Sequence, residues 1–233
     1  MDYESSRASG AAQLVEPTWQ NARVSRGDRQ WWVRVLRVVF AAIGAAAIVY
    51  VPVTASDGFD FANYFSYFTI LSNIGAVIVL VVGALFAPAA AWWQWCRGAV
   101  TTAMLITAIV YALLLAGIDV NLNDEWTNTV LHRLMPLVLL IDWAVFRPRA
   151  LPVGSWLTWL LLPLLYGVYT LSRGPFVDWY PYPFIDPREQ GYLSMTIAVI
   201  VVVVGMAAMS AGVYWLGTRG SGHRDNQTSY PRP

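Results

Sequence analysis

The chain lacks lysine altogether, and it has one cysteine, two histidines and few charged residues of any kind. Charged residues make up 12% of its 233 positions, about half the fraction of roughly 25% that is typical of soluble domains. With Cys96 as the sole cysteine, an intramolecular disulfide and a cysteine-based metal cluster are excluded. The net charge is +1 and no block of basic residues occurs, so nothing indicates nucleic-acid binding. No motif points to a cofactor or a metal site.

The chain is instead rich in long apolar stretches, and 57% of its residues are hydrophobic. A membrane span needs roughly 20 apolar residues at about 1.5 Å of rise each. Six segments meet this length, and they predict an all-α bundle of six transmembrane helices within residues 31–217. Polar tails at 1–30 and 218–233 are expected to be disordered, because they cannot bury a core. The six segments are Trp31–Val53, Phe61–Phe86, Gly98–Gly117, Trp126–Phe146, Ser155–Leu171 and Gly191–Gly217.

Arginine distribution predicts the orientation of this bundle. Six arginines lie in the N-terminal flank, one in the second loop, two in the fourth loop and three in the C-terminal tail. The first and third loops have none, and the fifth has only Arg173 and Arg188. Because basic residues are retained on the cytoplasmic side, we expect a multi-pass protein of the cell membrane with both termini in the cytoplasm.

His132 is the most informative single residue. It lies within the fourth apolar segment, and the other histidine, His223, lies in the C-terminal tail. An ionisable side chain at membrane depth is costly and marks a functional site by default. Two interpretations remain open: a hydrogen bond to a neighbouring helix, or catalysis.

A hydroxyl group is expected at a similar depth on the second segment. Ser66, Thr69 and Asn73 share one face of a helix there, and such a polar stripe is most often a contact between helices. Measured from the outer end of each segment, Thr69 lies roughly 12 Å and His132 roughly 9 Å into the membrane. If the two helices are neighbours, a threonine beside an imidazole forms an activated nucleophile. Asn73, one turn from Thr69, could then donate to the oxyanion.

The surroundings of His132 leave several roles open. Asn128, one turn earlier, or Asp124 beyond it, could orient the imidazole ring. Arg133 is either a snorkelling side chain or a partner for an anionic headgroup or a fatty-acid carboxylate. Asp142 is too distant to complete a triad, and we expect it to pair or to face water near Arg147.

The loop over residues 171–187 contains four prolines and several aromatic residues. It could form only an aromatic belt at the membrane interface. It could also fold over the outer mouth of the bundle and shape a site for an amphiphile.

Three stretches of the chain resemble the androgen-induced (FAR-17a-like) family of six-span membrane proteins and its bacterial relatives of unassigned function. They are Tyr64–Asn73, Asn128–Pro136 and Trp179–Ile185. Animal members of that family hydrolyse fatty acid esters of hydroxy fatty acids with an intramembrane threonine and histidine. The resemblance therefore implies catalysis by Thr69 and His132 on a lipid ester.

The leading prediction is thus a membrane lipid-ester hydrolase with membrane lipids as its partners. The alternative is a non-enzymatic membrane protein that binds lipid, serves as a scaffold or takes part in transport. The substrate and the oligomeric state do not follow from the sequence.

Overall fold

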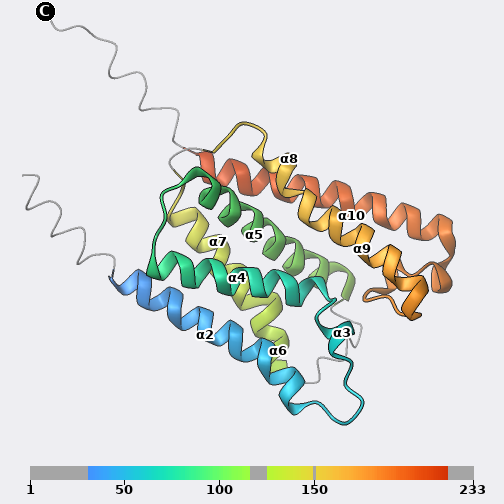
Figure 1. Ribbon diagram of the computed structural model, residues 1–233. Helices are drawn as coiled ribbons and strands as arrows, with labels where there is room; N and C mark the ends of the chain where they lie inside the picture. Colours follow the sequence, from blue (N-terminus) through green and yellow to red (C-terminus); the bar gives the residue numbers. More distant parts are fainter. Residues whose placement is uncertain (1–30, 116–124, 149–150, 220–233) are drawn as a thin grey trace, which may run out of the picture.

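A computed structural model of the protein describes residues 31–115, 125–148 and 151–219, which contain helices and no strands. Figure 1 shows their arrangement. The long helices are α2 (Trp31–Thr54), α4 (Phe68–Leu85), α5 (Ala91–Val110), α7 (Met135–Val145), α9 (Leu161–Val177) and α10 (Pro187–Thr218). The short elements are α3 (Phe61–Tyr64), η1 (Tyr111–Leu115), α6 (Glu125–Thr129), η2 (Val130–Leu134), α8 (Ser155–Trp159) and η3 (Pro183–Ile185). The expected tails fall almost entirely outside the described residues.

Within the described residues, five helices are long and apolar enough to cross a membrane. They correspond to the first, second, third, fourth and sixth predicted segments. Several apolar helices of this length indicate a multi-pass membrane protein. The third begins earlier than expected, at Ala91, because the tryptophan cluster that follows is helical.

The fifth predicted segment, Ser155–Leu171, is not one continuous span. It is divided into α8 and the 17-residue α9, which meet at Leu160. Pro163 explains the division, since it has no N–H to donate to the carbonyl of Trp159, the last residue of α8. A sixth span is therefore not established by the structure.

The second predicted segment is also interrupted, because α3 ends at Tyr64 and α4 begins only at Phe68. Asp60 caps α3 by accepting a hydrogen bond from the backbone N–H of Asn63 at 2.9 Å. Tyr67 then takes an extended conformation, with ψ of 133°. Thr69 is consequently the second residue of a helix, and not a residue about two turns into a continuous one.

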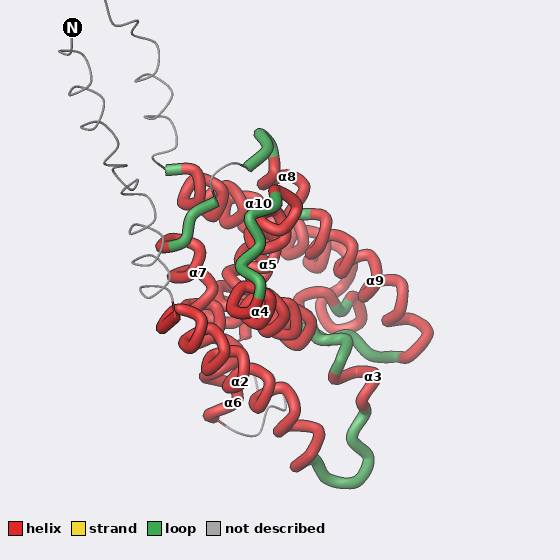
Figure 2. The backbone as a smooth tube through the Cα atoms, turned by 60° about the vertical axis from the view of Figure 1, so that its left-hand side comes forward, coloured by secondary structure: helices red, strands yellow, loops and turns green. Residues whose placement is uncertain are grey.

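Helices α2 and α4 pack side by side, and α4 packs in turn against α5. On the far side of α5 lie α9 and α10, as Figure 1 shows. In Figure 2, α6 lies beside α2. The segments η2 and α7 complete the contact between α2, α4 and α5.

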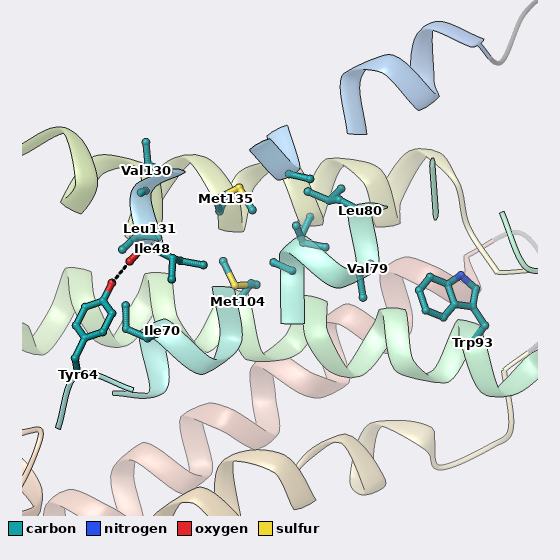
Figure 3. Close-up of a cluster of buried hydrophobic side chains, with 14 residues drawn as sticks. Ile48, Tyr64, Ile70, Val79, Leu80, Trp93, Met104, Val130, Leu131 and Met135 are labelled. Atoms are coloured by element: carbon teal, nitrogen blue, oxygen red, sulfur yellow. Dashed lines mark hydrogen bonds between the residues drawn. The ribbon is translucent and has the colours of Figure 1, made fainter. Parts of the chain in front are cut away.

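The largest buried cluster lies between these helices and is drawn in Figure 3. Gly44 allows α2 to come close to the segment around Met135, since a Cβ at this position would lie 2.7 Å from the Met135 Cε atom. Tyr64 closes the cluster by donating to the carbonyl of Ile48 at 2.7 Å. Small residues at such contacts are typical of helices that associate within lipid.

Asp142 is paired, which was one of the two expected alternatives, but its partners are Arg37 and Arg97. Its carboxylate accepts hydrogen bonds from Arg37 Nε at 2.7 Å and from Arg97 Nη2 at 2.8 Å. Arg147 instead donates to the backbone carbonyls of Ala144 and Arg219. Asp142 therefore links α2, α5 and α7.

Candidate functional site

His132 lies in η2, a single π-helical turn between α6 and α7. In this turn the N–H of Met135 bonds to the carbonyl of Val130, five residues earlier. Short π-helical insertions of this kind occur frequently at functional sites. The next carbonyl in that register, that of Leu131, would bond to residue 136, but Pro136 has no N–H.

Asn73 satisfies this carbonyl from the neighbouring helix. Its Nδ2 atom donates to the carbonyl of Leu131 at 3.1 Å and to the carbonyl of Thr69 at 2.8 Å. An amide has two such protons, so both are engaged. The contact fixes η2 against α4, and it does not fit the expected role of Asn73 as an oxyanion donor.

The structure brings Thr69 and His132 together. The Thr69 Oγ1 and His132 Nε2 atoms are 3.2 Å apart, and both side chains are buried. The other ring nitrogen, Nδ1, lies 3.2 Å from the backbone carbonyl of Asn128. Because a carbonyl can only accept, we infer that Nδ1 carries the proton of the neutral ring. Nε2 is then free to accept the hydroxyl proton of Thr69.

A tyrosine that no sequence motif indicates, Tyr111, holds the imidazole ring from one side. The ring of Tyr111 stacks on His132, with centroids 4.1 Å apart and planes at 22°. Its hydroxyl accepts a hydrogen bond from Asn128 Nδ2 at 2.6 Å. Asn128 therefore positions the site twice, through its carbonyl and through its amide.

A second tyrosine, Tyr182, reaches the site from the loop between α9 and α10. Its hydroxyl accepts a hydrogen bond from the backbone N–H of Phe68, the first residue of α4, at 3.1 Å. Burial raises the pKa of Tyr182 to about 12, against hydrogen bonds involving Thr69, Tyr166 and Phe68 that lower it. The phenol is therefore neutral at pH 7 and keeps a proton to donate. The sequence had indicated Tyr182 only as part of the aromatic, proline-rich loop and of the stretch Trp179–Ile185 that resembles the androgen-induced family.

Thr69 lies on the wall of a cavity of about 240 Å³. Its lining is almost wholly apolar and comes from α4, α5, η1, α9, the loop that contains η3, and α10. Two of the lining residues, Leu164 and Val168, are 42% and 63% exposed, so the cavity extends to the outer surface of the bundle. An apolar chain could therefore approach Thr69 from the side that faces lipid.

Arg133 does not join this group. It follows His132 in η2, but it is exposed, whereas His132 is buried. It is not among the residues that line the cavity. Among the described residues, no group of three or more His, Cys, Asp or Glu side chains could hold a metal ion.

Comparison with known proteins adds no relative: no protein-family model, no curated protein and no solved structure matches the chain.

Proposed function

We propose that this protein is an intramembrane lipid-ester hydrolase in which Thr69 is the nucleophile and His132 is the general base. The observation that carries the proposal is the 3.2 Å contact between Thr69 Oγ1 and a histidine whose other nitrogen is held by a backbone carbonyl. A nucleophile, a base and a group that orients the base are the parts expected of covalent catalysis. Through the three stretches named above, we further propose kinship with the androgen-induced family.

The proposed reaction proceeds in two halves. Thr69 Oγ attacks the ester carbonyl carbon while its proton passes to His132 Nε2. The tetrahedral intermediate collapses, and the leaving alcohol takes that proton, which leaves an acyl ester on Thr69. Water then attacks the acyl group, again with its proton taken by His132, and the fatty acid departs as the hydroxyl of Thr69 is restored.

The developing oxyanion needs donors, and the start of α4 lies where they are required. The dipole of α4 favours negative charge at its first turn. The N–H groups of Ile70 and Leu71 already donate to the carbonyl of Tyr67 at 3.1 Å, so they are not available as oxyanion donors. The phenol of Tyr182 already contacts this turn through Phe68. We assign oxyanion stabilisation to the phenol of Tyr182, assisted by the dipole of α4, in place of Asn73.

The apolar cavity beside Thr69 sets the substrate class. Its walls offer few polar groups, so a long acyl chain is a better occupant than a water-soluble ester. Because exposed residues of α9 form part of the lining, the chain would enter from the bilayer. We propose that both termini are cytoplasmic, which places the site in the outer half of the membrane.

Turnover of a long-chain ester by the purified protein in nanodiscs tests this function. Thr69→Val removes the hydroxyl at nearly constant volume and should abolish turnover, whereas Thr69→Ser should retain a measurable rate. His132→Gln should also abolish turnover, since glutamine cannot take up the proton. Thr102→Val is the matched control, because Thr102 is a fully buried threonine outside the cavity lining. Wild-type turnover by Thr69→Val would refute the proposal.

Lipid binding without turnover is the second candidate, and the cavity itself favours it. The two functions separate in a binding measurement with a non-hydrolysable ether analogue of the ester. A wild-type protein that binds the ether but does not cleave the ester would be a lipid-binding protein.

A further inference from the structure

A second cavity, of about 420 Å³, lies at the other end of the bundle from Thr69. It is bounded by the start of α2, the turn from α4 to α5, the start of α5 and the residues after α7. Four arginines line this basic pocket: Arg34, Arg37, Arg97 and Arg147.

Among the described residues around the basic pocket, positive charges outnumber negative charges. Arg37 and Arg97 share the single carboxylate of Asp142, which is the only acidic side chain in the described residues of α2, α4, α5 and α7. Arg34 and Arg147 add two more positive charges at the rim, where both are exposed. One arginine would suffice to neutralise a buried aspartate, so the second is in excess of what an ion pair requires.

The two inner guanidinium groups are rigidly held. Arg97 donates to Gln94 Oε1 at 2.7 Å and to the carbonyl of Phe146 at 3.1 Å, and its side chain is 9% exposed. Arg37 donates to the carbonyl of Gly83 at 3.0 Å. A fixed guanidinium loses little freedom when it binds an oxyanion, and its planar donors match phosphate geometry.

Apart from Gln94, the rest of the wall consists of apolar residues and includes the buried ring of Trp93. A pocket that joins fixed arginines to an apolar wall, at the end of a membrane helix bundle, suits a phosphate group attached to a lipid. The same arginines would also accept free phosphate.

We propose that the basic pocket binds a phosphate-bearing anion, supplied by the headgroup of an anionic phospholipid or by free phosphate. The site is separate from Thr69 and His132, so it stands or falls independently of the proposed hydrolase activity.

Native mass spectrometry of the full-length protein released from nanodiscs tests the lipid source. Nanodiscs of phosphatidylcholine mixed with phosphatidylglycerol should yield protein that retains phosphatidylglycerol in preference to phosphatidylcholine. The double variant Arg34→Gln/Arg147→Gln should lower that retention about tenfold or more, because each arginine near a headgroup contributes roughly 1 kcal/mol. Equilibrium dialysis against labelled inorganic phosphate, in phosphatidylcholine nanodiscs, tests the free anion.

Arg219→Gln is the matched control, because Arg219 lies at the same end of the bundle but does not line the basic pocket. It should retain the lipid as the wild type does. Saturable phosphate binding that the double variant loses would identify the free anion, and retained phosphatidylglycerol alone would identify the headgroup. The proposal is overturned if the wild type prefers neither anion, or if Arg219→Gln loses as much binding as Arg34→Gln and Arg147→Gln do.

Discussion

His132 Nδ1 lies 3.2 Å from the carbonyl oxygen of Asn128, four residues earlier in the chain. In a regular α-helix that carbonyl would accept the backbone N–H of residue 132. His132 lies in the π-helical turn Val130–Leu134, and its imidazole reaches back one turn to that carbonyl. Because Nδ1 faces this carbonyl, Nε2 faces Thr69. The backbone carbonyl of Asn128 thereby orients the imidazole for the acid–base chemistry that we propose.

Tyr182→Phe is expected to lower kcat by about 100-fold with little change in KM, because one oxyanion donor is worth roughly 10²- to 10³-fold in rate. Steady-state kinetics on a long-chain ester measure the effect. Tyr169→Phe is the control, since the Tyr169 hydroxyl contacts Ser66 Oγ at 2.8 Å and does not line the cavity. Equal losses in the two variants would remove Tyr182 from the mechanism.

Asn73→Ala should destabilise the protein by about 1–3 kcal/mol, because it leaves the buried carbonyl of Leu131 without a donor. A lower midpoint of thermal unfolding in detergent reports the loss. Asn63→Ala is the comparison, since Asn63 accepts from Arg173 in a partly exposed contact of smaller expected value. A midpoint for Asn73→Ala no lower than that of Asn63→Ala would show that the link between α4 and η2 is dispensable.

Gly98→Ala should also lower stability, by about 1–3 kcal/mol, through overpacking. A Cβ at this position would lie 2.1 Å from the Cζ2 atom of Trp159, so α5 and α8 would have to move apart. Gly205→Ala is the matched control on α10, because a Cβ there meets no atom within 4 Å. In a helix that change should be neutral or slightly stabilising. Equal unfolding midpoints for the two variants would contradict the close packing of Trp159.

Reporter fusions test the orientation. The arginine distribution predicts that fusions placed after Asp57 and after Asp124 report the outside of the cell, whereas a fusion after Arg147 reports the cytoplasm. A cytoplasmic signal from either of the first two would reverse the assignment of the proposed site to the outer half of the membrane.

Sequence reasoning reached the helical fold because apolar length and composition are local properties, and five of the six predicted segments became long apolar helices. It failed where a single residue interrupted a helix. Pro163 divided the fifth segment, and the extended Tyr67 divided the second, which moved Thr69 to a helix start. Neither break alters the hydropathy of its segment.

Contacts between residues far apart in the chain were also beyond prediction from the sequence. A common depth suggested that Thr69 and His132 could meet, but it could not show which helices are neighbours. The stacking of Tyr111, the arrival of Tyr182 and the two arginines on Asp142 all depend on how helices pack. No periodicity in a single sequence specifies such contacts.

Covalent labelling of Thr69 tests the central claim most directly. The purified protein is incubated with an alkyl fluorophosphonate, and the adduct is located by peptide mass spectrometry. We predict a single phosphonylated residue, Thr69, in the wild type, and at least a tenfold slower reaction in His132→Gln, since general-base assistance typically contributes 10²- to 10⁴-fold. An unlabelled Thr69, or equal labelling rates in wild type and His132→Gln, would contradict the dyad.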